Sequence, residues 1–182
     1  MAPTGDYKAD VAILEGAEFI RTGYITSGMD LLSSGKVKRI IIVLHNIAPA
    51  HRPYGISGNY PEMVRQKLKS LGLKEMEFEV IVVPIRYPVT LKEAEVALET
   101  LSKDNVKSAI LLSPAFHTRR SFLAYQYVGI SLQIRIYPYA CFTEYQLNSW
   151  WLEETGVRDF AAELFKLCYY LAGGYIPFKF SY

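Results

Sequence analysis

The sequence predicts an α/β domain with a Rossmann-like, doubly wound and mainly parallel five-stranded sheet that carries helices on both faces. Short apolar segments alternate with segments of helical periodicity along the chain. Connections of this kind are right-handed crossovers, and they cover both faces of a parallel sheet. The chain has 182 residues and no linker or low-complexity run, so we expect a single domain, 1–182, with a core over about 9–170.

The five expected strands are short and mostly apolar, as is typical of strands that are buried in a parallel sheet. Their expected ranges are 11–15, 39–44, 78–85, 108–113 and 133–137. Helical periodicity predicts crossover helices between them, over 24–34, 61–71, 90–103 and 118–128. Gly35, Gly72 and Gly129 follow the expected ends of three of these helices, where glycine caps are common.

A last helix is predicted over 157–171 from apolar residues at helical spacing. We expect it to pack on the sheet through Phe160, Leu164 and Cys168. The two cysteines, Cys141 and Cys168, form neither a disulfide framework nor a metal-ligand spacing. We interpret both as buried small hydrophobic residues, with a single disulfide as the alternative.

The composition limits the classes of partner. Twenty basic residues against eighteen acidic ones give a net charge of +2, unlike a protein that coats nucleic acid. The longest apolar runs are far shorter than the roughly 20 residues that span a bilayer. Residues 1–10 lack the apolar region of a signal peptide. We therefore expect no nucleic-acid partner and a soluble chain, either cytoplasmic or the soluble domain of an envelope protein.

The predicted topology gives the location of a site. In open parallel sheets, ligands bind outside the carboxyl ends of the strands, where the strand order reverses. For the order 3-2-1-4-5, that point lies between the first and fourth strands. Residues 15–18 would then face residues 113–120 across one crevice.

The segment 113–120, with the sequence SPAFHTRR, indicates an anion site. Thr118 is a candidate N-cap, so free backbone N–H groups would point toward the ligand together with guanidinium groups. His117 adds a group that titrates near neutral pH. Neighbouring helical residues point about 100° apart, so we favour Arg120 over Arg119 as the group in the crevice. Ser113 lies at the end of the strand and is expected to contact the ligand.

The loop after the first strand adds candidate groups. Glu15 and Glu18 are candidates for a general base, a metal ligand or an acceptor for a substrate hydroxyl. Gly16 is expected to contact the ligand, but no GxGxxG motif surrounds it, so a standard dinucleotide site is not expected. Thr90 and Glu93 form a predicted capping box, and Thr90 is also a candidate ligand contact.

The segment 45–60 follows the second strand without helical periodicity, and long loops of this kind often form lids or binding loops. His45 and Asn46 are candidate ligand contacts at its start. His51, Arg52 and Tyr54 could reach the same crevice. The spacing of His45 and His51 fits no common metal-ligand pattern, so no metal is assigned.

Three motifs together resemble the bacterial YdcF/SanA/ElyC-like family over about 9–170. They are ADVAILEG at 9–16, TLKEA at 90–94 and SPAFHTRR at 113–120. His117 and Arg120 keep the His-x-x-Arg spacing that follows the fourth strand in that family. The resemblance implies a Rossmann-like domain and a role in envelope integrity and peptidoglycan or lipid-carrier metabolism. It also implies S-adenosylmethionine binding in some members. Members often carry an N-terminal membrane anchor, and its absence from this sequence means either that this member has none or that the sequence was trimmed, so membrane association through such an anchor stays an open expectation.

Three classes of function remain open from these residues. The first is a site for a phosphate-bearing small molecule or lipid head group, in which Arg120 stabilises charge while His117 or Glu15 moves a proton. The second is a non-catalytic envelope factor that acts through protein partners, using the aromatic residues Tyr139, Phe142, Tyr145, Trp150 and Trp151. The third is an enzyme that binds S-adenosylmethionine or a nucleotide. No cofactor is identified.

Overall fold

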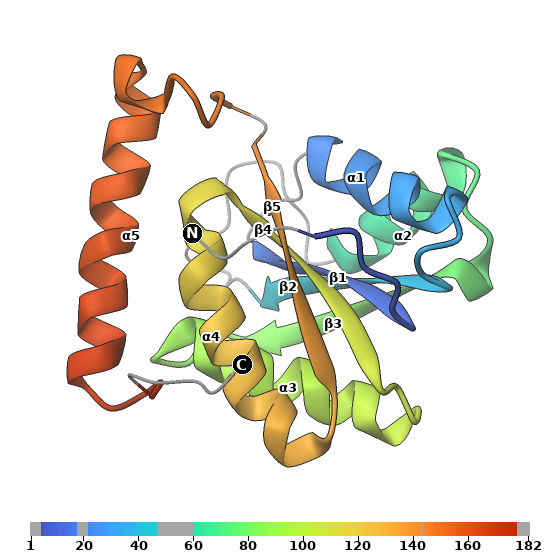
Figure 1. Cartoon of the computed structure of the whole chain (residues 1–182). Helices are drawn as coiled ribbons and strands as arrows, with labels where there is room; N and C mark the ends of the chain where they lie inside the picture. Colours follow the sequence, from blue (N-terminus) through green and yellow to red (C-terminus); the bar gives the residue numbers. More distant parts are fainter. Residues whose placement is uncertain (1–4, 18–21, 47–59, 143, 178–182) are drawn as a thin grey trace.

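The computed structural model describes residues 5–17, 22–46, 60–142 and 144–177, and it confirms the predicted α/β fold. One sheet holds five strands in the order β3-β2-β1-β4-β5, and each neighbouring pair is parallel. Figure 1 shows the twisted sheet with helices around it. The strands are β1 (Val11–Ala17), β2 (Arg39–Asn46), β3 (Phe78–Pro84), β4 (Ser108–Pro114) and β5 (Arg135–Cys141).

β1 lies in the middle of the sheet, between β2 and β4. Its residue Ile13 pairs with Ile41 on one side and with Leu111 on the other. The order of the strands along the chain reverses between β1 and β4, as predicted. The carboxyl ends of these two strands therefore form the point at which open α/β sheets bind ligands.

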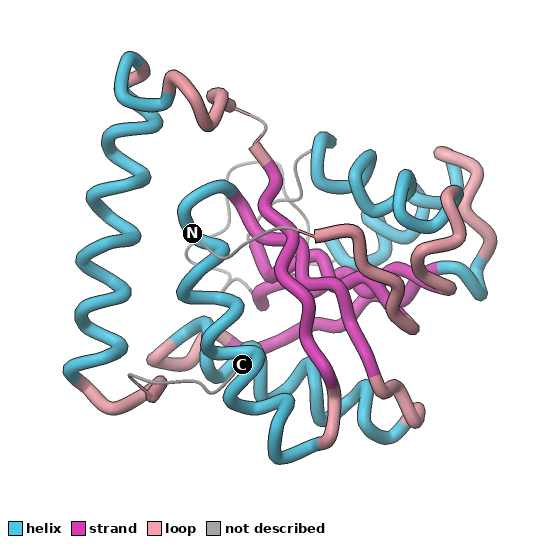
Figure 2. Tube along the Cα trace, viewed as in Figure 1, coloured by secondary structure: helices cyan, strands magenta, loops and turns pink. Residues whose placement is uncertain are grey.

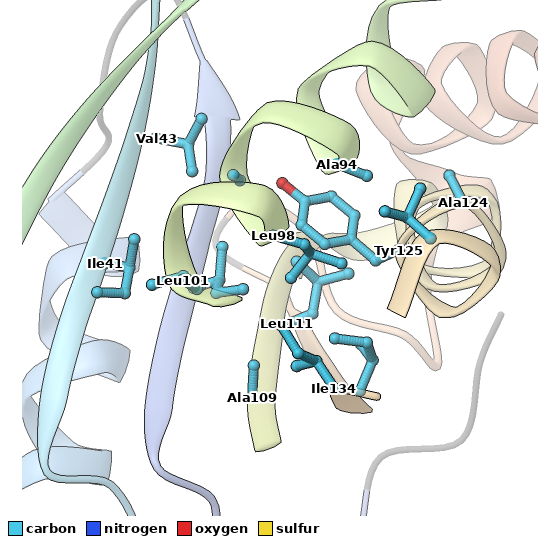
Figure 3. Packing of buried hydrophobic residues seen from close by; sticks show 14 of the residues in the cluster. Ile41, Val43, Ala94, Leu98, Leu101, Ala109, Leu111, Ala124, Tyr125 and Ile134 are labelled. Carbon is cyan, nitrogen blue, oxygen red and sulfur yellow. The ribbon is translucent and has the colours of Figure 1, made fainter. Parts of the chain in front are cut away.

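Two apolar cores sandwich the sheet because alternate side chains of each strand point to opposite faces. Ile40 and Ile42 pack toward α1 (Thr22–Ser33) and α2 (Tyr60–Ser70). Ile41 and Val43 pack toward α3 (Val89–Lys103) and α4 (Thr118–Leu132). Figure 3 shows the second core, in which Leu98, Leu101 and Tyr125 are fully buried.

The ends of the crossover helices confirm two of the three predicted glycine caps. Gly35 and Gly72 adopt φ of +67° and +92°, a conformation that glycine reaches without strain. The third prediction is wrong, because α4 continues through Gly129 to Leu132 and is capped by Gln133 in the left-handed conformation. Gly129 instead permits close packing, since a Cβ there would lie 2.5 Å from the backbone oxygen of Ile134.

The last helix, α5 (Glu154–Ala172), differs from its prediction. It runs beside α4 and the short 3-10 helix η3 (Ala115–His117) and stands apart from the sheet (Figures 1 and 2). Phe160, Leu164 and Cys168 remain exposed, so they do not form a buried contact with the sheet. The physical reason is that α3 and α4 already cover that face. Among the described residues, no helix is long and apolar enough to cross a membrane.

The two cysteines occupy different environments, and both are free thiols. Cys141 on β5 is buried, and burial raises the pKa of its thiol to about 11. Cys168 is exposed on α5. The expectation of burial is therefore confirmed for Cys141 and wrong for Cys168.

Candidate functional site

The carboxyl ends of β1 and β4 bring together two of the predicted catalytic groups. Glu15 is the fifth residue of β1, and His117 ends the 3-10 turn that follows β4. His117 Nε2 donates to Glu15 Oε1 over 2.7 Å. Two segments about a hundred residues apart in the sequence therefore meet, as the predicted strand order requires.

A second carboxylate holds the other nitrogen of His117. Nδ1 lies 2.9 Å from Oε2 of Glu163, which comes from α5. Burial disfavours a charged imidazole, but Glu15 and Glu163 outweigh that effect and raise the pKa of His117 to about 9. The two carboxylates therefore favour the protonated form of His117.

Arg120 is buried, with 5% of its surface exposed, and it shares the same carboxylate. Its Nε donates to Glu163 Oε2 over 2.9 Å, and its Nη1 donates to the Thr90 hydroxyl over 2.6 Å. Its Nη2 lies 2.6 Å from His117 Nδ1, so two cations lie side by side against Glu163. Burial opposes the charge of Glu163, but His117 and Arg120 hold the pKa of that carboxyl well below its usual range. The Arg120 guanidinium also lies 5.0 Å from the ring centre of Tyr170.

Glu15 keeps one oxygen without a partner. The Ser121 hydroxyl donates to its Oε1, but Oε2 and the buried Ser113 hydroxyl have no hydrogen-bond partner within the described part of the chain. Burial opposes ionisation of Glu15, yet His117 and the Ser121 hydroxyl hold the pKa of its carboxyl below the usual value. Buried polar groups are normally paired, so this spot suits a polar group of a ligand or a water.

A second carboxylate–histidine pair lies beside the first, around Gly16. Glu93 on α3 is 2% exposed, and its Oε2 lies 2.8 Å from His45 Nε2. Its Oε1 accepts the Gly16 N–H over 2.9 Å and the Tyr125 hydroxyl over 2.6 Å. A Cβ at Gly16 would lie only 2.6 Å from His45 Nε2, so this position requires glycine. Glycine at this position therefore allows the Glu93 and His45 side chains to pack close to the backbone.

The first turn of α3 joins the two pairs. Thr90 accepts from Arg120, and Glu93, three residues later, accepts from His45. Residues three apart on a helix are neighbours on its surface. One helical turn therefore connects both carboxylate–histidine pairs.

Two predictions about helix starts are wrong at this site. α3 begins after Pro88, and the carboxylate of Glu93 points to His45 and Tyr125, so Thr90 and Glu93 form no capping box. α4 continues directly from η3, and the Thr118 hydroxyl donates to the Ala115 carbonyl inside that turn. All three side chains that were predicted to cap a helix instead contribute to the polar network or to the preceding turn. α4 therefore does not begin at an N-terminus capped by Thr118.

The remaining predicted residues lie apart from the network or outside the described residues. Asn46 and Arg119 are exposed. Glu18, His51, Arg52 and Tyr54 lie outside the described residues. No group of three metal-ligating side chains is arranged to hold a metal ion in the described ranges.

Sequence reasoning missed several members of the network, namely Glu163, Ser121, Tyr125 and Tyr170, and it missed Glu93 as a partner of His45. Glu163 lies at a polar position within an otherwise apolar stretch of α5, between Ala162 and Leu164. A charged residue inside an apolar helical pattern is a signal of a buried ion pair. Nothing in the sequence linked it to His117 over 46 residues.

Three of the aromatic residues proposed as a partner surface, Phe142, Tyr145 and Trp150, belong to an aromatic cluster. Phe116, next to His117, contacts the rings of Phe142, Tyr145, Trp150 and Phe160 at centroid distances of 5.0–6.2 Å. This aromatic cluster attaches the start of α5 to η3. Because Phe116 directly precedes His117, the packing of this cluster also holds the backbone of His117 in place.

A groove of about 570 Å³ lies elsewhere and is lined by residues of α1 and α2. This groove shares no residue with the polar network around His117, so it is not part of the candidate site. Its lining residues are Ile25, Tyr60, Met63, Val64, Gln66, Lys67 and Ser70. In the comparisons with known proteins, no protein-family model and no curated protein matches the chain.

Proposed function

We propose that the chain binds a phosphate-bearing small molecule or lipid head group at the carboxyl ends of β1 and β4. We further propose that this binding serves bacterial cell-envelope maintenance, as the resemblance to YdcF/SanA/ElyC-like proteins implies. The observation that carries the binding proposal is the adjacent pair of His117 and Arg120, whose side chains share the carboxylate of Glu163.

Glu163 has the character of an internal anion that a ligand could replace. Its carboxylate accepts from Nε of Arg120 and faces Nδ1 of His117, as a phosphate oxygen would. A phosphate group carries more negative charge and an additional oxygen, so it would satisfy the same donors at least as well. Exchange requires only that the Glu163 side chain turn away, and this side chain belongs to a helix that buries few residues.

Glu15 and Ser113 supply a second point of contact. The free Oε2 of Glu15 is a charged acceptor, and the Ser113 hydroxyl both donates and accepts. A hydroxyl or amine close to the phosphate of the ligand would pair with them. This arrangement favours a polar phosphate ester over inorganic phosphate alone.

The proposal is tested by calorimetric titration of the protein with glycerol 3-phosphate and with pyrophosphate. Arg120→Ala should weaken binding tenfold or more, because a hydrogen bond to a charged group contributes about 1.5–3 kcal/mol. Arg119→Ala is the matched control, since Arg119 is exposed on the same helix, and it should bind as the wild type does. Glu163→Gln should bind more tightly, because it removes the negative charge that competes with the ligand.

Each variant is checked for folding by its melting temperature before titration. Equal affinities for the wild type and Arg120→Ala would contradict the proposal. Weaker binding by Glu163→Gln would assign Glu163 to ligand binding or to folding rather than to competition. Equal loss in the Arg119 and Arg120 variants would point to general surface charge.

A further inference from the structure

We infer that the ligand of this site ends in a phosphomonoester, and that Lys166 is a further basic residue that recognises this doubly charged group. The inference rests on the proposed phosphate site and deepens it, because it names the class of phosphate group and adds one binding residue. The observation that carries it is the set of nitrogen atoms around the Glu163 carboxylate. Basic side chains from η3, α4 and α5 all lie within 3.2 Å of its oxygens.

These nitrogen atoms occupy both oxygens of Glu163. Arg120 presents one edge of its guanidinium, with Nε 2.9 Å from Oε2 and Nη2 3.2 Å from Oε1. Nδ1 of His117 lies 2.9 Å from Oε2, and Nζ of Lys166 donates to Oε1 over 3.0 Å. Each oxygen therefore faces two nitrogen atoms of basic side chains. Proteins use the same two-point contact with an arginine edge to bind phosphate.

The charges at this position are unbalanced once the Glu163 side chain turns away. Arg120 and Lys166 each carry one positive charge. His117, whose protonated form its carboxylates favour, is offset by Glu15 on its other side. Two positive charges then remain for the ligand. A phosphomonoester carries about two negative charges at neutral pH and offsets both, whereas a phosphodiester carries one.

Burial makes this imbalance matter. The side chain of Arg120 is 6% exposed and that of Glu163 is 13% exposed, so water screens charges here far less than at the surface. Glu93, another buried carboxylate of the network, is engaged by partners of its own. The charge of the ligand should therefore strongly affect its affinity.

Lys166 belongs to a helix that stays attached when the Glu163 side chain turns away. Before Glu163, Phe160 packs in the aromatic cluster. After it, the buried Tyr170 accepts the Thr90 N–H through its hydroxyl over 3.0 Å. Lys166 lies between these two attachments, and its Nζ already reaches the position of the Glu163 carboxylate. A phosphate at that position would receive the same donor.

This charge requirement divides the phosphate compounds that the proposed function includes. A phosphodiester head group, with one charge, does not meet it. A soluble sugar or polyol phosphate meets it, and so does a lipid that ends in a phosphomonoester. The shared chemistry is a terminal phosphomonoester near a hydroxyl or amine that pairs with Glu15 and Ser113.

The test compares glycerol 3-phosphate with its methyl diester and with glycerol 3-sulfate by calorimetric titration at pH 7.5. The sulfate has three free oxygens but only one charge, so it separates charge from shape. Glycerol 3-phosphate should bind about tenfold or more tightly than either of the others. Equal affinity for glycerol 3-phosphate and one of the others would overturn this inference and leave the proposed binding function standing. If the wild type binds none of the three, both fail.

The role of Lys166 is tested by the ratio of the affinities for glycerol 3-phosphate and its methyl diester. Competition by Glu163 affects both ligands alike and cancels in this ratio. Lys166→Met should lower the ratio about two- to fivefold, as for loss of one partly exposed charge contact. Arg158→Met is the matched control, since Arg158 is an exposed base on the same helix that pairs with Asp159, and the ratio should not change.

Melting temperatures confirm that the variants fold, and Lys166→Gln repeats the test at the same position. An unchanged ratio in folded Lys166 variants would overturn the assignment of Lys166. An equal drop in the Arg158 variant would overturn it as well, because general surface charge would then explain the effect.

Sedimentation with phosphatidylcholine vesicles distinguishes the two sources of a phosphomonoester. The vesicles contain either phosphatidic acid, a lipid monoester, or phosphatidylglycerol, a lipid diester. Binding to phosphatidic acid alone would support the inference with a lipid as the source. Binding of glycerol 3-phosphate without binding to either vesicle would support it with a soluble source. Equal binding to both vesicles would overturn the inference, because a monoester would then have no advantage.

Discussion

The helices over the sheet and the last helix are held by different forces. α3 buries seven of its fifteen residues, whereas α5 buries only Gly156 and Tyr170 of its nineteen. Leu98 of α3 is fully buried, and Leu164 of α5 is 48% exposed. The sheet and its helices are thus stabilised mainly by apolar burial, while α5 depends on an aromatic cluster and on the charge of Glu163.

This difference explains how the site could respond to a ligand without disturbing the fold. The residues that fix Glu15, Glu93 and Arg120 belong to the apolar body formed by β1, α3 and α4. Glu163, whose carboxylate pairs with His117 and Arg120, belongs to α5, which buries few residues. A phosphate that displaces Glu163 would loosen α5 and leave the sheet intact.

The same substitution in the two regions should show the largest contrast. Leu98→Ala should lower the free energy of unfolding by about 2–5 kcal/mol, because it creates a cavity in the fully packed core. Leu164→Ala should cost less than about 1 kcal/mol, since its side chain is already half exposed. Urea unfolding of both variants measures the difference.

Similar losses in both variants would break the comparison. A large loss at Leu164 would mean that α5 is covered in solution by another surface, so the measurement is repeated at two protein concentrations. A concentration-dependent midpoint would identify self-association as the cause.

The charge of His117 should make the attachment of α5 depend on pH. The folded-state pKa of about 9 lies above the unfolded value of about 6.5, so the folded protein binds more protons between these pH values. The resulting stability is fully present below about pH 6.5 and is lost as the pH rises through 9. Its size is at most about 3 kcal/mol, from 1.36 kcal/mol per pKa unit.

The measurement compares urea unfolding of the wild type and His117→Gln at pH 6, 7.5 and 9.5. The stability advantage of the wild type should shrink toward alkaline pH. A constant advantage across this range would show that His117 is not an imidazolium between Glu15 and Glu163.

The smallest effect concerns the two cysteines, one in each region. Cys168 on α5 should react with a maleimide at neutral pH many times faster than Cys141, which is buried and has a raised pKa. Modification of Cys168 should leave the melting temperature almost unchanged, because the side chain is exposed. Mass spectrometry of labelled peptides identifies the reacting thiol, and faster labelling of Cys141 would refute the assigned positions.

The fold was predictable from the sequence because it depends on strong local patterns. Apolar runs identified the strands, and the strand order that was assumed for a doubly wound sheet placed Glu15 across from His117, as the structure has them. The exposure of α5 was not predictable, because helical periodicity indicates which face of a helix is apolar but not how much of that face is buried. Glu163 was missed for the same reason.

Glu93 shows a second limit. A threonine followed three residues later by glutamate is the pattern of a capping box, and the pattern is equally compatible with side chains that point into a site. The tertiary contacts with His45 and Tyr125 determine the outcome, and they come from β2 and α4, far away in the sequence. Local sequence patterns thus predict helices and strands well, but they predict the hydrogen-bond partners of polar side chains poorly.

The most direct test of the central claim is a crystal structure of the protein grown with pyrophosphate. We predict an anion that bridges the Arg120 guanidinium and His117, with the Glu163 side chain turned away and the sheet unchanged. An anion bound elsewhere, with Glu163 still paired to Arg120, would contradict the claim that these two cations form the ligand site.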